Sequence, residues 1–216
     1  MDSWDEVFPT NAIDEPPEIQ YGPVVNEPLC GRSAIARRRV VGGSEAGFGV
    51  YPWQALLQIG TSRCGGALVG RQHVITAGHC VHSMAKKFGE FPPTGIRVYL
   101  GEYSLYADVE PLPRQAYSVN RIYMHPFYEF TPQADRFDVA ILKLSRPVLY
   151  EAHISPICLP EKGRDLEEGT VAMVSGWGAT EADSAKRPKE LQVADVKVVS
   201  GKKCEKWHLG NDIDVS

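Results

Sequence analysis

The sequence predicts an all-β protein, either a barrel or a sandwich. Short apolar segments of strand length recur along the chain, and turns rich in Gly, Pro and charged residues separate them about every eight to twelve residues or slightly more. Helical periodicity is scarce. The chain has 216 residues, 43% of them apolar, which suffices for one or two small cores. Its longest uncharged apolar runs are strand-sized, so we expect no membrane-spanning segment.

The strands are expected in the following order. The first half of the chain predicts strands at residues 53–59, 66–69, 73–76, 97–100, 117–124 and 139–144. After Pro160, further strands are expected at 171–175 and 191–199, with an exposed polar loop at 179–190 between them. Residues 201–209 are expected to form a short amphipathic helical turn.

The amino-terminal segment differs from the rest in composition. Residues 1–29 hold five prolines and seven acids with apolar side chains in no period, which predicts a disordered or extended leader. The net charge is −4, but residues 1–31 contain seven acids and no Lys or Arg, which leaves +3 for the remainder. A charge of +3 on the remainder does not indicate a basic nucleic-acid-binding surface, so no nucleic-acid partner is expected.

Five cysteines stand at positions 30, 64, 80, 158 and 204, without a Cys-x-x-Cys pair. This pattern argues against zinc or thioredoxin chemistry and for disulfides formed in an oxidising compartment. We therefore expect neither a metal nor a cofactor, and spacing alone leaves the pairing open. The first residues show no secretory signal. A chain that looks oxidised but lacks an export signal is most simply a fragment, or a gene model that begins late.

Two residues are candidates for catalysis. His79 stands in Thr-Ala-Gly-His-Cys and Asp138 in Asp-Val-Ala-Ile-Leu. A hydroxyl nucleophile needs a neutral imidazole to take its proton, and a carboxylate to hold the tautomer of that imidazole. Taken alone, a histidine beside a disulfide and an Asp at a strand start are just as typical of structural roles. The other histidines lack supporting context and are interpreted as surface or strand-end side chains: His73, His82, His125, His153 and His208.

What favours the catalytic interpretation is a set of motifs in a characteristic order. They are Arg37-Arg38-Arg39 with Val40-Val41-Gly42-Gly43, Tyr51-Pro52-Trp53-Gln54, Cys64-Gly65-Gly66-Ala67-Leu68-Val69, the His79 block, His125-Pro126-Phe127-Tyr128, the Asp138 block, Pro156-Ile157-Cys158-Leu159-Pro160 and Gly176-Trp177-Gly178. In this order the chain resembles trypsin-like (chymotrypsin-family, S1) serine proteases from about Cys30 to its end. One departure is Gly78, where that family usually has Ala.

The resemblance implies a chymotrypsin-like double β-barrel. The first barrel, about residues 50–150, would be complete, and the second, about 161–216, incomplete. Residues 1–39 would be an activation segment and 40–216 a partial peptidase domain, with cleavage between Arg39 and Val40. The implied disulfides are Cys64 with Cys80 and Cys30 with Cys158, and Cys204 would stay unpaired.

The implied function is that of a secreted zymogen of a trypsin-like endopeptidase, which cleaves protein substrates and is activated by another trypsin-like protease. His79 would be the general base and Asp138 its orienting acid. No serine stands in a Gly-x-Ser-x-Gly context, so the nucleophile, oxyanion hole and specificity pocket are absent and this chain is expected to be inactive. Two alternatives stay open, namely a non-catalytic decoy or cofactor in an extracellular proteolytic cascade, and an incomplete gene model without its own function.

Two further expectations concern the surface. An unclosed second barrel would expose apolar side chains, and oligomers would form through its edges or through Cys204. The side chains expected to be exposed are Val174, Trp177, Leu191, Val193, Val196 and Val198. Glu102 and Glu110 lie where relatives can bind calcium, but two loop carboxylates are more often solvated, so no calcium is expected.

Overall fold

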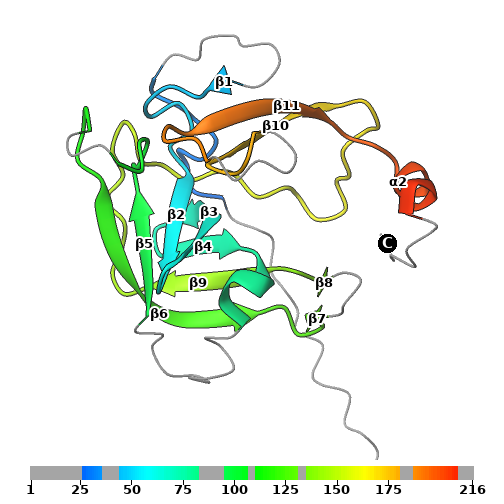
Figure 1. Ribbon diagram of the computed structural model, residues 1–216, viewed down its shortest axis with the longest axis horizontal. Helices are drawn as coiled ribbons and strands as arrows, with labels where there is room; N and C mark the ends of the chain where they lie inside the picture. The colour runs from blue at the N-terminus through cyan, green and yellow to red at the C-terminus, as the bar shows by residue number, and fades with distance from the viewer. Residues whose placement is uncertain are drawn as a thin grey trace, which may run out of the picture.

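The computed structural model describes residues 26–35, 44–82, 95–106, 110–130, 135–180 and 187–208. The regular structure of these residues is almost entirely β, which confirms the predicted class (Figure 1). The described residues contain no helix long and apolar enough to cross a membrane.

Six antiparallel strands close into a barrel in the order β2-β3-β4-β9-β6-β5. Their bounds are β2 Gln54–Ile59, β3 Ser62–Gly70, β4 His73–Thr76, β5 Ile96–Leu100, β6 Gln115–Met124 and β9 Ala140–Leu144. Each strand expected in the first half of the chain is present, and the prediction of a complete first barrel is confirmed. The main error is β3, which starts four residues before the predicted residue 66.

The strands form because apolar residues alternate with polar ones at the period of a pleated strand. In β9, Ala140, Leu142 and Leu144 point into the barrel and are buried, whereas Ile141 is exposed and Lys143 is partly exposed. The strand β5 repeats this pattern. Together the inward side chains fill one core.

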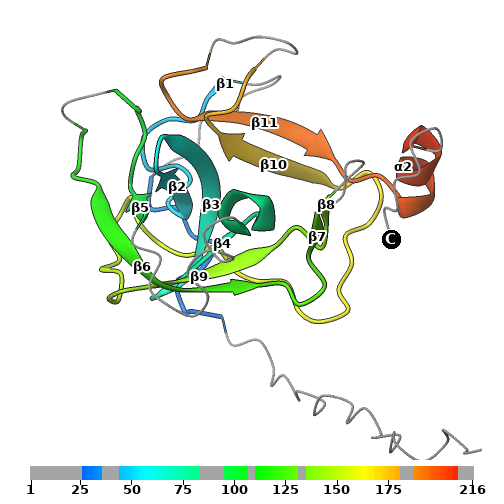
Figure 2. The same ribbon diagram turned by 60° about the horizontal axis from the view of Figure 1, so that its bottom comes forward.

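A second sheet of three strands does not close. It has the order β1-β11-β10, with β1 Ser44–Glu45, β11 Gln192–Lys197 and β10 Val171–Gly176. Figure 1 and Figure 2 both show β10 and β11 lying across one side of the barrel. The helix α2, Gly201–His208, follows β11. Within the residues that the structure describes, the second sheet is not closed into a barrel, which agrees with the expectation.

The packing of this sheet corrects one expectation. Trp177, Leu191 and Val193 are buried, with 9%, 3% and 6% of their surface exposed, so the prediction that they face solvent is wrong. They pack in one cluster with Tyr51 and Leu56 of the barrel side. The barrel wall covers one face of the sheet, and this contact buries the three side chains.

The prediction holds for two side chains on the sheet's other face. Val174 and Val196 are 58% and 40% exposed. Val198, which was also expected to be exposed, is partly buried. An open sheet with an apolar outer face therefore remains, although it is smaller than expected.

The described part of the leader, residues 26–35, is attached to the barrel. A disulfide joins Cys30 to Cys158, and the side-chain amide of Asn26 pairs with the backbone N–H and C=O of Leu159. Residues 1–25 and 36–43 lie outside the described residues. The expected cleavage site, Arg39 and Val40, is among them.

Candidate active site

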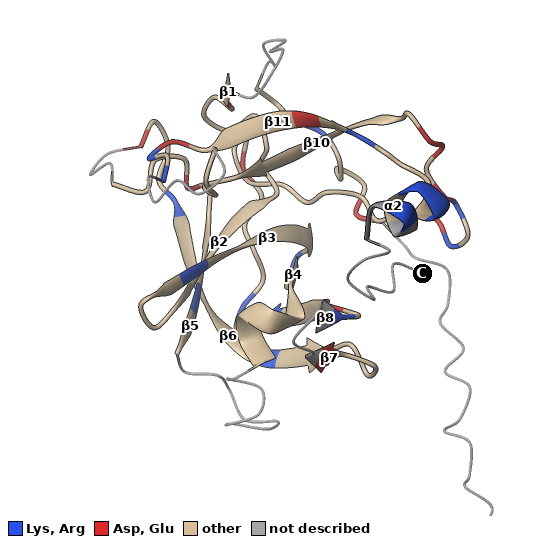
Figure 3. Ribbon diagram, turned by 45° about the vertical axis from the view of Figure 1, so that its right-hand side comes forward, with Lys and Arg blue, Asp and Glu red and all other residues tan. Residues whose placement is uncertain are grey.

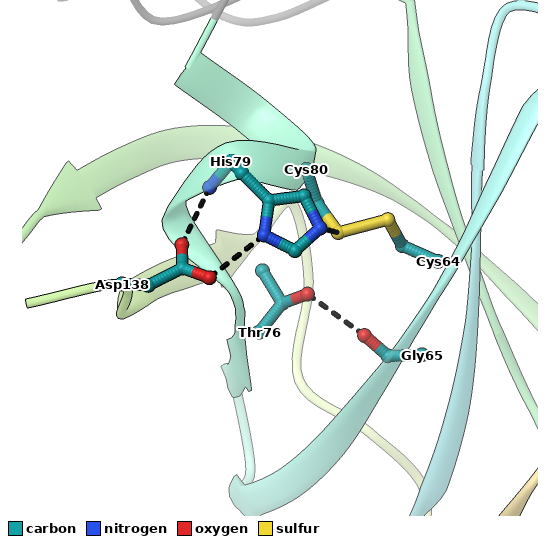
Figure 4. A network of polar contacts seen from close by, with 6 residues as sticks. All are labelled: Cys64, Gly65, Thr76, His79, Cys80 and Asp138. Carbon is teal, nitrogen blue, oxygen red and sulfur yellow. Dashed lines mark hydrogen bonds and ion pairs between the residues drawn. A yellow bond between two sulfur atoms is a disulfide. The ribbon is translucent and has the colours of Figure 1, made fainter. Parts of the chain in front are cut away.

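His79 lies in a helical turn, residues 78–82, that directly follows β4. A disulfide between Cys64 in β3 and Cys80 ties this turn to the barrel. At its base, the Thr76 hydroxyl donates to the Gly65 carbonyl at 2.7 Å. The backbone of His79 is therefore held from two sides (Figure 4).

Gly78 is closely surrounded by two side chains. A Cβ at this position would lie 2.9 Å from Cδ2 of Tyr128 and 3.1 Å from the terminal methyl group of Met124. Contacts under 3.0 Å require a neighbour to move. The glycine thus lets the Tyr128 ring pack directly against the turn that carries His79.

Asp138 stands just before β9, after a short hairpin of β7 (Glu129–Phe130) and β8 (Asp135–Arg136). The preceding Phe137 has φ of 50°, the left-handed conformation that non-glycine residues rarely adopt. The Val139 N–H donates to the Phe137 carbonyl at 2.7 Å. This tight turn aims the Asp138 side chain at His79. Neither the hairpin nor the helical turn at 78–82 is predicted from the sequence.

The two side chains meet in a paired contact. Oδ2 of Asp138 lies 2.7 Å from Nδ1 of His79, and Oδ1 accepts the backbone N–H of the same histidine at 2.7 Å. Figure 4 shows the carboxylate facing both nitrogens. Using both oxygens fixes the carboxylate in orientation as well as position. The sequence places the two residues 59 positions apart, and the barrel brings them together.

The charge state of Asp138 decides the tautomer of the ring. Partial burial raises its pKa, but the hydrogen bonds from the His79 ring and from the backbone of His79 and Gly78 outweigh this, and the pKa is lowered overall. The carboxylate is therefore ionised near neutral pH and can only accept hydrogen bonds. Nδ1 must then carry the proton, which leaves Nε2 of a neutral ring as the acceptor.

The sulfur atoms beside the ring do not form a metal site. Nε2 of His79 lies 3.5 Å from Sγ of Cys80, and one ligand atom each of Cys64, His79 and Cys80 fall within 4.8 Å of one another. Both sulfurs belong to the disulfide, and thiolates rather than disulfides bind metals. The remaining cysteine, Cys204, is the free one.

Two other predictions made from the sequence can now be located. Glu102, 6% exposed, accepts hydrogen bonds from Arg114 at 2.8 and 3.1 Å, whereas Glu110 accepts the backbone N–H groups of Tyr103 and Ser104. Both carboxylates thus form hydrogen bonds within the segment of residues 102–114.

The interpretation of His153 as a surface side chain is wrong, because it is 1% exposed and stacks on Phe48 at a ring distance of 5.4 Å.

A cavity of about 810 Å³ opens between the barrel and the open sheet. Cys64 and Gly65 border it on the barrel side, and Gly176, Trp177 and Gly178 on the sheet side. Because Cys64 is bonded to Cys80, the cavity lies next to the His79 turn. It is large enough to hold a short peptide segment.

Comparison with known proteins adds to this geometry. The sequence model of the family described as Trypsin matches residues 40–215. The serine proteinase stubble of Drosophila melanogaster is 36% identical over 189 residues, which cover 83% of this chain and 23% of that protein. Testisin of Homo sapiens is 33% identical over 197 residues, which cover 89% of this chain and 60% of that protein. The chain therefore spans less than two thirds of the length of these relatives.

A solved structure is also similar. The structure of neuropsin, a serine protease expressed in the limbic system of mouse brain, superposes with a TM-score of 0.65 at 29% sequence identity. The match covers 81% of this chain and 72% of that one.

Proposed function

Because the chain belongs to the trypsin family of serine proteases, we propose that His79 and Asp138 are the general base and the orienting carboxylate of a peptide-bond hydrolase. The observation that carries this proposal is the paired contact of Asp138 with the ring and the backbone of His79, both at 2.7 Å. A carboxylate held in this way keeps Nε2 as proton acceptor and stabilises the imidazolium that forms.

In a form of the enzyme that also contains the nucleophile, Nε2 of His79 takes the proton of a serine hydroxyl as that oxygen attacks the substrate carbonyl. The imidazolium then gives the proton to the leaving amine, and water hydrolyses the acyl-enzyme by the reverse sequence of proton transfers. We propose protein substrates for this reaction. Cleavage after Arg39 would produce the active form from a zymogen.

This sequence contains the base but no nucleophile in the required context. None of its serines stands in Gly-x-Ser-x-Gly, so we propose that the chain of 216 residues does not hydrolyse peptide bonds. Since the nucleophile and oxyanion hole carry most of the rate, a base acting on water would leave very little activity.

The test is covalent labelling. The purified chain, before and after trypsin treatment, should not react with a serine-directed fluorophosphonate and should not turn over Arg or Lys esters. An extended chain that continues in frame into a Gly-Asp-Ser-Gly motif should do both, and its His79→Ala variant should lose both. Stoichiometric labelling of the short chain would contradict the proposed inactivity, and an inactive extended chain would contradict the assigned base.

The burial of Trp177, Leu191 and Val193 favours a second candidate, a non-catalytic binding protein that acts as a decoy or cofactor in an extracellular cascade. The open sheet is partly packed against the barrel, and a packed chain can stay folded and bind partners without catalysing a reaction. A monodisperse monomer with hydrogen-exchange protection over residues 171–197 as strong as over the barrel would support it. Rapid exchange of these amides together with aggregation would oppose it.

We propose an extracellular location. The disulfides Cys30–Cys158 and Cys64–Cys80 support it, because such bonds persist in oxidising compartments. Non-reducing mass spectrometry of the secreted and the intracellular protein from expressing cells tests this, and a chain found only in reduced form inside cells would contradict it.

A further inference from the structure

The six strands of the closed barrel contain no Asp or Glu. Their charged residues are Arg63, Arg97, Arg121 and Lys143, although the chain as a whole has a net charge of −4. In Figure 3 the labelled barrel strands show blue segments and no red ones, whereas red segments occur on β11 and on the loops. The barrel strands are therefore electropositive within an acidic chain.

Bases gather on one part of the barrel's outer surface. Lys143 of β9 is paired with Arg121 of β6 on one side and with His73 of β4 on the other. Directly paired residues point to the same face of a sheet, so their side chains form a continuous row. Arg97 of β5 extends this row, since it donates to the Ser118 hydroxyl of β6 at 2.8 Å.

Two bases continue the surface at the strand ends. Arg146, just after β9, donates to the Ala116 carbonyl of β6 at 3.3 Å. Arg71, in the turn before β4, lies over the Tyr150 ring at 4.6 Å. We call the surface formed by Arg71, Arg97, Arg121, Lys143 and Arg146 the basic face.

Within the part of the chain that the structure describes, no member of the basic face forms an ion pair with a carboxylate. The Arg side chains of this face contact a hydroxyl, a carbonyl and the rings of Tyr117, Tyr123 and Tyr150. Clustered like charges repel one another, and an anionic partner lying across them would relieve that repulsion.

The leader enters the described fold at the edge of this face. Burial and the nearby Glu27 carboxylate raise the pKa of Tyr150 to about 12, while Arg71 opposes them. Arg71 lies over the Tyr150 ring, and Glu27 is close enough to act on the pKa of the same tyrosine. Asn26 is anchored close by through its two hydrogen bonds to Leu159.

The segment that precedes this anchor has the complementary charge. Residues 1–25 contain six acids and no Lys or Arg. Twenty-five residues can extend to about 80 Å at about 3.3 Å per residue. Arg121 lies two strand spacings from β4, roughly 10 Å. Length and point of attachment therefore both allow the acidic segment to cover the basic face.

We propose that residues 1–25 dock on the basic face of their own chain. The Cys30–Cys158 disulfide keeps the segment attached even after cleavage at Arg39–Val40, so its effective concentration stays in the millimolar range. The docked segment then competes with any other polyanion for this surface. This role is independent of the proposed catalytic one, because no residue of the basic face contacts His79 or Asp138.

Zero-length carbodiimide cross-linking tests the contact directly, because it joins a lysine amine to a carboxylate. Lys143 is the one lysine among the five residues of the basic face. Links from Lys143 to acids of residues 1–25 are expected within the monomer at about 10 mM salt. They should fall at least about fivefold at about 1 M salt, where the Debye length shrinks from about 30 Å to about 3 Å. The exposed Lys162 and Lys189 are internal controls. Equal linking at these controls, or links found only in dimers, would overturn the proposal.

A pair of charge-matched variants gives a second readout on heparin resin, used as a probe polyanion. One variant neutralises four leader acids, and the other neutralises four exposed acids of the loop 161–168, so both lose the same charge. The substitutions are Asp5→Asn, Glu6→Gln, Asp14→Asn and Glu18→Gln against Glu161→Gln, Asp165→Asn, Glu167→Gln and Glu168→Gln.

The leader variant should elute at a NaCl concentration higher by about 0.1 M than the loop variant, because its basic face is uncovered. Adding Arg121→Glu and Lys143→Glu to both variants should abolish this difference. Near-UV circular dichroism verifies that each variant is folded. Identical elution of the two charge-matched variants would contradict docking, since heparin would then meet an equally open face in both.

Discussion

Phe137 stacks face to face on His125, with ring centroids 4.9 Å apart and ring planes 4° apart. Phe137 directly precedes Asp138 and, among the described residues, is the one non-glycine residue with positive φ. The left-handed conformation costs such a residue about 1–2 kcal/mol, and an aromatic stack returns about 0.5–1.5 kcal/mol. The stack therefore holds the turn that aims Asp138 at His79.

Replacement of Phe137 separates these two contributions. Phe137→Ala loses the stack and keeps the strained backbone, whereas Phe137→Gly loses the stack but adopts the positive φ freely. We expect the Gly variant to be more stable than the Ala variant by about 1 kcal/mol in denaturant unfolding. An Ala variant as stable as the Gly variant would show that the turn relaxes when the ring is removed.

The packing around the buried His153 is open to a similar test. A Cβ on Gly101, whose φ is +79°, would lie 2.7 Å from Cδ2 of His153 and 2.9 Å from its Nε2. Gly101→Ala should therefore destabilise the fold by about 2–4 kcal/mol, through backbone strain and overpacking together. Gly60→Ala is the matched control, because its φ is +58° with no atom within 4 Å, and it should cost about 1 kcal/mol. Equal losses would mean that His153 moves aside.

The Asp138 contact should depend on pH in one direction. The pKa of Asp138 is lowered from 3.8 because, although burial raises it, the hydrogen bonds from His79 outweigh burial. Its ionised form therefore stabilises the folded state, fully so above pH 3.8, and this contribution is lost as the pH falls toward the lowered native value.

Nuclear magnetic resonance can follow this contact. The nitrogen shifts of the His79 ring should report a proton on Nδ1 at neutral pH. In acid, the ring shifts should show a further step below pH 3.8, when Asp138 takes up its proton. Asp138→Asn should remove this acidic step. If the step that Asp138→Asn removes were already complete at pH 5, this result would contradict the lowered pKa of Asp138.

Limited trypsin treatment probes the predicted activation site. We expect early cleavage between Arg39 and Val40, giving a fragment that begins Val-Val-Gly-Gly. The leader should stay attached through Cys30–Cys158 until a reductant is added. In a Cys30→Ser variant the leader should be released without reductant. A leader released from the unmodified chain under non-reducing conditions would argue against this disulfide.

Cys204 is the thiol left free by the two disulfides. Under native, non-reducing conditions iodoacetamide should add one group to the chain, and after reduction and unfolding it should add five, one for each cysteine. Reductant-sensitive dimers should disappear in Cys204→Ser. Dimers that persist in this variant would point to association through the open sheet, on which Val174 and Val196 are exposed.

The sequence alone determined the class of fold and the strands of the first barrel, and it singled out His79 and Asp138 as candidates for catalysis. Alternation of apolar and polar residues is a local signal, and it located segments such as His73–Thr76 and Ala140–Leu144. The ordered motifs around His79 and Asp138 pointed to a family whose fold brings distant residues together. No alternation could have shown that these two side chains meet at 2.7 Å.

Only the tertiary structure decided which surfaces are covered. Val193 lies in β11 of the open sheet, and Trp177 and Leu191 lie next to its strands, yet the wall of the first barrel buries all three. In the same way, Phe137 gains its stacking partner His125 from a strand end twelve residues earlier. Burial and stacking depend on neighbours distant in sequence, and a local pattern does not encode them. The basic face likewise arises from strand pairing, because the register alone places Arg121 beside Lys143.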